Sequence, residues 1–217
     1  MVARGPFGRA ALLDPVPFDL GCGFETGRLH VRTAGDWVAR VRGVTNLRER
    51  IHPPLRGDEA DQLYGFLDYH RATLQRKAAG LDAAGLAQTL QPSSMTLGGM
   101  LKHLAFVEDN WFSLFLHGHE RAAPWRDVDW KADPDWDWHS AASDDPKALR
   151  ALHDDAVVRS RELVAGVGLD TLSVRRLHGV DQPVTLRWIV LHMMEEYARH
   201  NGHADLIRES IDGVVGE

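Results

Sequence analysis

The feature that most constrains the fold is an unbroken helical pattern at residues 185–210. Apolar residues recur there at helical spacing, and the segment, which begins after Pro183, contains no proline. In a helix, residues four apart lie one turn above each other on the same face. His192, Glu196 and His200 therefore share a face, and a carboxylate and an imidazole at this spacing can bind one divalent ion. The apolar positions of this segment include Leu186, Ile189, Met193 and Leu206.

Three more segments carry helical patterns, at about residues 58–80, 94–112 and 145–166. Each follows an Asp, Ser or Thr that can cap the free N–H groups of a first turn. A polar stretch at 118–144 separates the second of these helices from the third. Four substantial helices with one long crossover predict an all-α fold, a four-helix bundle over residues 58–217.

Each predicted helix has an apolar stripe that would face a common core. His70 lies on the first stripe and is interpreted as a hydrogen-bonded core histidine. Gly98 and Gly99 cost about 1 kcal/mol each in a helix relative to alanine. We therefore expect another backbone, or a ligand, to approach where these residues have no Cβ. The stripes are Leu63, Phe66, Leu67, His70 and Leu74, then Met100, Leu104, Val107, Trp111 and Leu114, then Leu149, Leu152, Ala156 and Leu163.

The crossover places four tryptophans among aspartates, at Trp125, Trp130, Trp136 and Trp138. We expect these rings to fix the crossover on the helices, and a lid or aromatic wall over a pocket is the functional alternative. The segment 133–137 imitates the start of a calcium loop, but Trp138 stands where that loop requires glycine, so this reading is rejected. Farther along, alternation around Leu172 predicts a small hairpin or an extended loop.

Residues 1–57 are rich in Gly, Arg and Pro and show no sustained period, so they are predicted to be an irregular N-terminal extension. The single cysteine, Cys22, excludes an intrachain disulfide and a Cys-rich zinc site, and suits a reducing cytoplasm. The net charge of -6 argues against a nucleic-acid partner. No apolar run approaches the roughly 18 residues of a membrane span, so no membrane partner is expected and the predicted localisation is cytoplasmic.

Twelve histidines are present, and most lie in polar stretches or near predicted helix ends. His103 differs, because it can face Glu196 and His200 if the second and fourth helices are neighbours. Three N and O ligands would leave one coordination position open, which is typical of a reactive metal site. On spacing alone, a hydrogen-bonded pair of His200 and Glu196 on a partly wet face is the alternative. The histidines interpreted as solvated are His117, His119, His139, His153 and His178.

Two segments carry a family resemblance, MTLGGMLKHLA at residues 95–105 and RWIVLHMMEEYARHNGH at residues 187–203. They resemble the DinB-like (DinB/YfiT) metalloprotein superfamily, and most closely an actinobacterial branch similar to mycothiol-dependent maleylpyruvate isomerase. The resemblance implies a four-helix bundle in which His103, Glu196 and His200 bind the metal. Many members have His at the position of Glu196, whereas the isomerase-like branch has Glu there.

The resemblance also implies a function, in which a divalent metal, zinc before nickel, iron or manganese, binds a small thiol such as mycothiol as its thiolate. The thiol would then attack an electrophile, in a transferase or isomerase reaction. Because the only cysteine lies in the extension, the sulfur would come from this cosubstrate. His192 and His203 are candidate proton carriers, and Arg199, like Arg187, is a candidate for binding a carboxylate.

Two other functions are alternatives to this one. A non-catalytic, stress-related metal-binding bundle would need the same ligands, and only an activity measurement separates it from a transferase. Hydrolysis by metal-bound water is disfavoured, because the His-Glu-x-x-His pattern of metallopeptidases is absent. By analogy with the superfamily, pairing into a homodimer is a further expectation.

Overall fold

The computed structural model describes residues 50–216. Most of the predicted N-terminal extension, with Cys22, therefore lies outside the described residues. Its described part, residues 50–57, contains no helix or strand.

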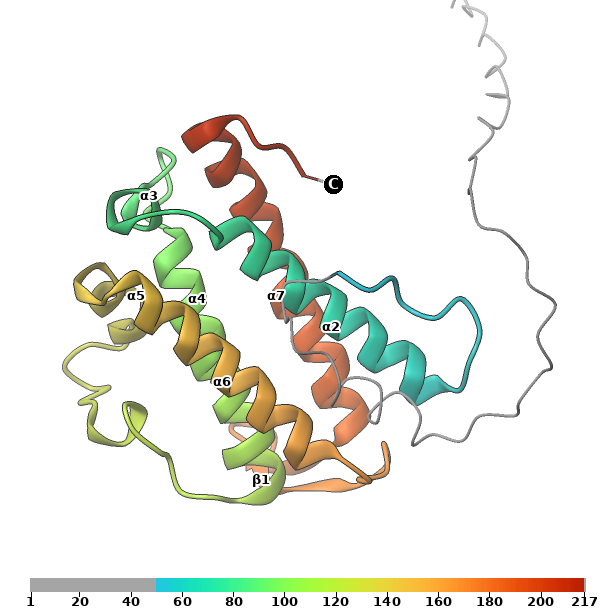
Figure 1. Cartoon of the computed structure of the whole chain (residues 1–217). Coiled ribbons are helices and arrows are strands. Elements are labelled where there is room, and N and C mark those ends of the chain that lie inside the picture. Colours follow the sequence, from blue (N-terminus) through green and yellow to red (C-terminus); the bar gives the residue numbers. More distant parts are fainter. Residues whose placement is uncertain (1–49, 217) are drawn as a thin grey trace, which may run out of the picture. The chain divides into compact units, whose positions relative to one another are not determined.

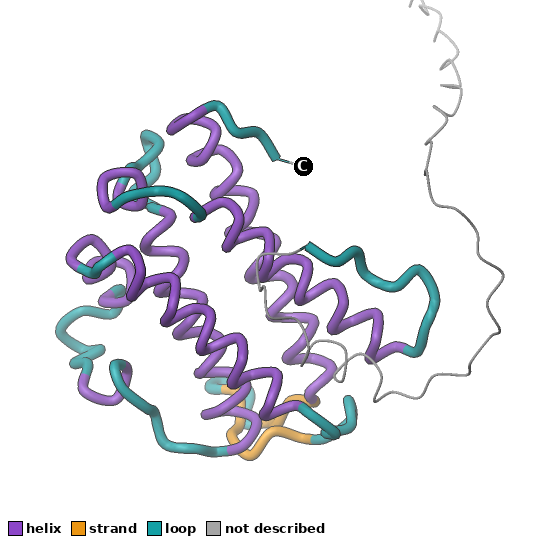
Figure 2. The backbone as a smooth tube through the Cα atoms, in the orientation of Figure 1, coloured by secondary structure: helices purple, strands orange, loops and turns teal. Residues whose placement is uncertain are grey.

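The described chain is mostly helical, as the sequence predicts, with one small sheet (Figure 2). None of the described helices is long and apolar enough to cross a membrane. The α-helices are α2 (Glu59–Ala78), α3 (Ala83–Ala87), α4 (Leu97–Glu108), α5 (Trp136–Ser140), α6 (Pro146–Val164) and α7 (Leu186–Asp212). A π-helix, η1 (Asp109–Leu116), continues α4, and η2 (Trp125–Asp127) and η3 (Ala141–Ser143) are short 3-10 turns. The strands are β1 (Leu172–Leu177) and β2 (Gln182–Thr185).

Side-chain caps begin the four long helices where the sequence predicts them. Asp58 Oδ1 accepts a hydrogen bond from the N–H of Asp61 at the start of α2. Asp145 caps α6 in the same way, and Thr185 caps α7. Thr96 caps α4. These caps satisfy N–H groups that a helix cannot pair internally.

Helix α2 packs along α7, and both helices run in the same direction (Figure 1). At their starts, Arg187 Nε donates to Glu59 Oε1 at 2.8 Å. At their ends, Arg208 Nη1 donates to the carbonyl oxygens of Lys77 and Ala79, each at 2.8 Å. These contacts fix the axial position of α7, the helix that carries Glu196 and His200, relative to α2.

Helix α4 packs along α6, and these two helices also run in the same direction (Figure 1). Gly98 near the start of α4 faces Leu149 near the start of α6. After η1, His117 Nε2 donates to the carbonyl oxygen of Leu163 at 2.9 Å near the end of α6. Because neighbouring parallel helices need a returning connection, the polar stretch between them is a true crossover. Helix α4 also contacts α7, which brings His103 to the side of Glu196.

The buried face of α2 differs in part from the predicted stripe. Phe66 was expected to be buried, but it is 51% exposed, whereas Tyr64 and Leu67 are buried. In a helix, Phe66 lies about 100° around the axis from Leu67. Leu206 on α7 is likewise 56% exposed. Approximate helical spacing therefore does not by itself predict burial. Burial depends on how far around the helix axis a residue lies from the centre of the packed face.

Buried polar residues on α2, α4, α6 and α7 form a network of hydrogen bonds that joins all four long helices. Those on α2 lie on its buried face. Arg71 donates to both oxygens of Glu108, at 2.7 and 2.6 Å. The Tyr197 hydroxyl donates to Glu108 Oε1 at 2.8 Å. His153 Nε2 lies 2.8 Å from that hydroxyl, and Gln75 Nε2 lies 3.2 Å from His153 Nδ1. Because the amide N–H of Gln75 can only donate, Nδ1 accepts and Nε2 carries the proton of a neutral imidazole.

The expectation that His153 is solvated is therefore wrong. Its side chain is fully buried, and burial lowers its pKa to about 4. Burial by itself raises the pKa of Glu108, but the charge and hydrogen bonds of Arg71 outweigh it and lower the pKa. His153 is buried although the sequence around it is polar, because its side of α6 packs against Tyr197 and Gln75.

The segment after α6 forms a hairpin, which decides between the two predicted alternatives. β1 and β2 are antiparallel, with Leu172 opposite Thr185 and Leu177 opposite Gln182. β2 ends at the residue that caps α7, and β1 lies against η1. The hairpin thus connects the end of α6 to the first turn of the helix that carries two of the candidate ligands.

Candidate metal centre

The three predicted ligands converge. His103 on α4 and Glu196 and His200 on α7 each offer one ligand atom, and these atoms lie within 4.8 Å of one another. The imidazole rings of His103 and His200 are 5.0 Å apart between centroids and meet edge to face. All three side chains are partly buried. The group is therefore partly shielded from solvent but not sealed from it.

The spacing of Glu196 and His200 suits a shared ion better than a direct hydrogen bond. Glu196 Oε2 and His200 Nε2 are 3.5 Å apart, beyond the usual hydrogen-bond range of about 2.7–3.2 Å. Two ligand atoms bound to one zinc ion at about 2.0–2.2 Å stand roughly 3.4 Å apart in a tetrahedron. The other nitrogen of His200, Nδ1, is buried without a hydrogen-bond partner among the described residues. No hydrogen bond at Nδ1 therefore fixes the orientation of this ring.

The charge state of Glu196 also fits a ligand. Contact with the His200 ring lowers its pKa most, and the neighbouring imidazoles of His192 and His103 lower it further. Burial opposes this effect but does not cancel it. Glu196 is thus a carboxylate at neutral pH, the form in which it can bind a cation.

The crossover holds His103 from behind. Asp137 on α5 lies with Oδ2 2.6 Å from His103 Nδ1, and it is only 3% exposed. Trp138, the next residue, stacks on His103 with 4.7 Å between ring centroids and lies 5.5 Å from the His200 ring. Trp138 therefore forms an aromatic wall of the site, the alternative considered from the sequence, while Trp125 is buried and packs the crossover against α4.

Asp137 was not identified as a site residue from the sequence. It lies in the segment that imitates a calcium loop, and no pattern of spacing links it to His103, which is 34 positions away. A carboxylate beside a tryptophan in a crossover was the only available signal. Its pairing with His103 depends on how the crossover folds over α4.

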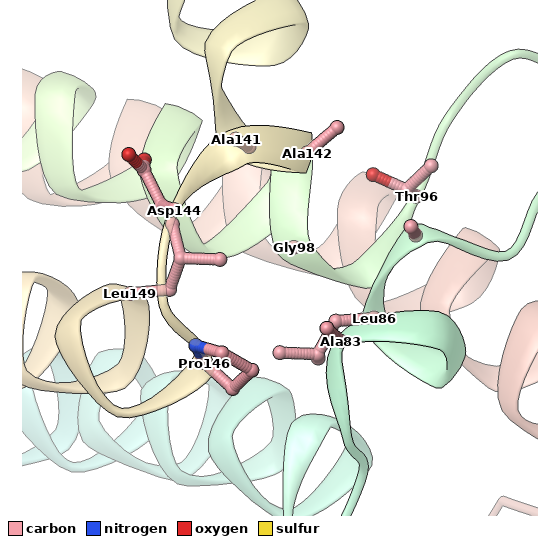
Figure 3. Close-up of a pocket in the computed structure, with 10 residues that line it drawn as sticks. Ala83, Leu86, Thr96, Gly98, Ala141, Ala142, Asp144, Pro146 and Leu149 are labelled. Carbon is pink, nitrogen blue, oxygen red and sulfur yellow. The ribbon is translucent and has the colours of Figure 1, made fainter.

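Gly98 and Gly99 of α4 both lie close to other residues, as we expected from the cost of glycine to helix stability. A Cβ on Gly98 would lie 3.2 Å from the carbonyl oxygen of Leu86 and 3.4 Å from Leu149 Cδ1. A Cβ on Gly99 would lie only 2.7 Å from Trp138 Cε3. The cavity beside Gly98, of about 10 Å³, has room for about one water molecule and not for a substrate (Figure 3).

His192, a predicted proton carrier, lies beside the three ligands. Its Nε2 is 3.6 Å from Glu196 Oε1. Its ring stacks on Trp188 at 5.1 Å and meets the edge of Trp111 at 4.8 Å. Trp111 belongs to η1, and π-helical segments often occur at functional sites because they change the direction of side chains. Here the π-helix supports the aromatic contact that orients His192.

The other two candidates lie farther out. His203 is exposed, and its ring is 6.3 Å from that of His200. Arg199 is 70% exposed, with Nη1 3.7 Å from Glu195 Oε1. Arg187 pairs with Glu59 and Asp170 at the far end of the helix. The structure thus brings His192 to the three ligands and leaves Arg199 at the surface.

A larger cavity of about 470 Å³ lies next to the site and shares Trp138 with it. Its size suits a small organic molecule. The lining residues are Ser94, Met95, Thr96, Asp135, Trp138, His139 and Ala142.

Comparison with known proteins assigns a family to this arrangement. The model of the mycothiol-S-transferase family matches residues 62–213, which include all three candidate ligands. No curated protein matches the chain.

Proposed function

Because this chain belongs to the mycothiol-S-transferase family, a member of the DinB-like superfamily that its motifs resemble, we propose that it transfers a mycothiol-type thiol to an electrophile with the help of a divalent metal. The observation that carries the proposal is the convergence of His103, Glu196 and His200 within 4.8 Å. In keeping with the superfamily, we take the four packed helices α2, α4, α6 and α7 to be its four-helix bundle.

We assign zinc to the site, because two imidazoles and one carboxylate are ligands that zinc accepts and they leave one position free. A zinc ion held there would lower the pKa of a bound thiol, so that its sulfur is nucleophilic at neutral pH. His103 and His200 would contribute ring nitrogens from two different helices. Glu196, already ionised, would contribute the negative charge.

The chain's own groups account for the proton and the substrate. His192, beside Glu196, is assigned to accept the proton that the thiol loses. The thiol sulfur then forms a bond to the electrophilic carbon while the bond from that carbon to the leaving group breaks, and the leaving group departs with the electron pair. Trp138 shields the reacting atoms on one side, and the cavity beside it has room for the rest of the thiol. His203 and Arg199 are assigned to outer parts of the substrate.

The proposal is tested with the purified chain, mycothiol and a bromobimane electrophile. Thioether formation is measured by chromatography with bound zinc, after metal removal by a chelator, and after zinc is restored. We expect conjugation above the uncatalysed rate only when metal is bound. His192→Gln should keep the metal and lower kcat, whereas His178→Ala, in the exposed turn between β1 and β2, should change neither.

A different result would favour the other candidate function. If the wild-type chain contains a full equivalent of zinc and accelerates no conjugation with mycothiol or other small thiols, it is a metal-binding bundle without this catalysis. If it contains no metal as isolated and takes up none, the proposed site itself is wrong.

A further inference from the structure

The contact between Asp137 and His103 has no role in the reaction as proposed so far. Asp137 is buried, belongs to the crossover rather than to α4 or α7, and contacts Nδ1 of His103. We propose that Asp137 is a positioning residue that holds His103 in the tautomer and orientation needed to bind a metal. This inference rests on the metal site of the proposed function.

The chemistry of the contact selects one tautomer. A carboxylate accepts hydrogen bonds, so His103 Nδ1, at 2.6 Å from Asp137 Oδ2, must carry the proton. In a neutral imidazole, this leaves the lone pair on Nε2. That nitrogen is then the one with which His103 would bind an ion shared with Glu196 and His200.

The same helix also fixes the plane of the ring. Trp138 follows Asp137 in α5 and stacks on His103 with an interplanar angle of 28°. A hydrogen bond in the ring plane and an aromatic face against the ring together restrict rotation about the side-chain bonds of His103. Gly99, one turn before His103 on α4, permits this stacking because it has no Cβ. Three features of the chain therefore converge on one imidazole.

An alternative is that Asp137 only anchors the crossover to α4. A neighbouring pair already has that geometry, because Lys102 Nζ on α4 lies 2.5 Å from Asp144 Oδ2 at the end of the crossover. In the described part of the chain, neither Lys102 nor Asp144 forms an ion pair or hydrogen bond with Glu196 or His200. Asp137 and Asp144 can therefore be compared directly. Asp137 contacts the candidate ligand His103, whereas Asp144 contacts Lys102, the residue before it.

The test compares Asp137→Ala, Asp137→Asn and Asp144→Asn with the wild-type chain. Zinc dissociation constants are measured by competition with a chromophoric chelator, and cobalt replaces zinc to record the absorption spectrum of the site. Loss of a partner that orients a metal-binding histidine typically weakens binding by about 10- to 100-fold. We expect that loss in Asp137→Ala, a smaller one in Asp137→Asn, which keeps an acceptor, and no significant change in Asp144→Asn.

A second measurement needs no metal. Nitrogen-15 NMR of the metal-free protein reports which ring nitrogen of His103 carries the proton. We expect the Nδ1–H form in the wild-type chain and in Asp144→Asn, and its loss in Asp137→Ala. Circular dichroism and thermal unfolding establish that each variant is folded, and Asp137→Asn replaces Asp137→Ala if the latter is not.

The outcomes separate this inference from the proposed function. If Asp137→Ala and Asp137→Asn bind zinc as the wild-type chain does, while His200→Ala does not, the positioning role is wrong and the metal site stands. If the wild-type chain binds no zinc, both proposals fail. If zinc binds with the expected order of affinities but no thiol is conjugated, the positioning role of Asp137 holds and the transferase reaction does not.

Discussion

The edge of the Trp138 ring occupies the space that a Cβ on residue 99 would need, with Cε3 only 2.7 Å from that position. Gly99 therefore decides how closely α5 approaches α4. Because Trp138 stacks on His103 and Asp137 precedes it, any displacement of the ring also disturbs the contact of Asp137 with His103.

Gly99→Ala should lower the free energy of unfolding by about 1–3 kcal/mol, because a methyl group is forced into a filled space. It should also weaken zinc binding, which a chelator competition measures. The matched control is Gly202→Ala on α7, two residues after His200. Apart from the neighbouring residues of its own helix, no atom of the described residues lies within 4 Å of a Cβ there. Because alanine favours a helix by about 1 kcal/mol over glycine, this control should stabilise the chain. Equal effects of the two substitutions would contradict the prediction.

His103→Ala, Glu196→Ala and His200→Ala should each remove most of the bound metal. Two remaining ligands cannot compete with water for the ion as three can. Elemental analysis of the purified variants measures the metal content directly. His70→Ala is the control, since His70 is a partly buried histidine whose ring and carbonyl oxygen lie against Asn201 and not against the three ligands. Full metal content in His200→Ala would show that the site is misassigned.

Arg71→Met should destabilise the chain by about 3–5 kcal/mol, because it leaves the buried carboxylate of Glu108 without its ionic partner. Denaturant unfolding measures the loss. The double variant Arg71→Met with Glu108→Gln should lose less than the two single variants together. Arg187→Met removes exposed ion pairs with Glu59 and Asp170 and should lower the free energy of unfolding far less than Arg71→Met does. Additive single and double effects at Arg71 and Glu108 would refute the coupling.

Burial of His153 predicts a specific pH dependence of stability. Its pKa is about 4 in the folded chain against an ordinary 6.5, so the unfolded chain binds this proton more readily. The stability that the neutral ring provides is complete above pH 6.5 and is lost as the pH falls toward 4. Between pH 7 and pH 5 the loss amounts to about 2 kcal/mol. Unfolding measured at both pH values should show this decrease in the wild-type chain and a smaller one in His153→Gln; identical slopes would be inconsistent with it.

Local signals in the sequence were sufficient for most of the helical fold. Capping residues such as Asp58 and Asp145, and apolar positions at helical spacing, depend only on neighbours within a few residues. For the same reason Glu196 and His200 could be paired in advance, since four residues always make about one turn of a helix. The glycine pair of α4 likewise predicted a close contact, but not which residue makes it.

Contacts between distant segments were decided by the tertiary structure alone. Whether His103 meets Glu196 depends on the packing of α4 against α7, and the carboxylate behind His103 comes from a crossover 34 residues farther along the chain. The burial of His153 and the exposure of Phe66 also follow from the angle at which each helix meets its neighbours. The sequence by itself therefore determined which side chains share a helix face, because that is a local property. Which helix faces contact each other depends on the packing of the whole core, so only the tertiary structure decides it.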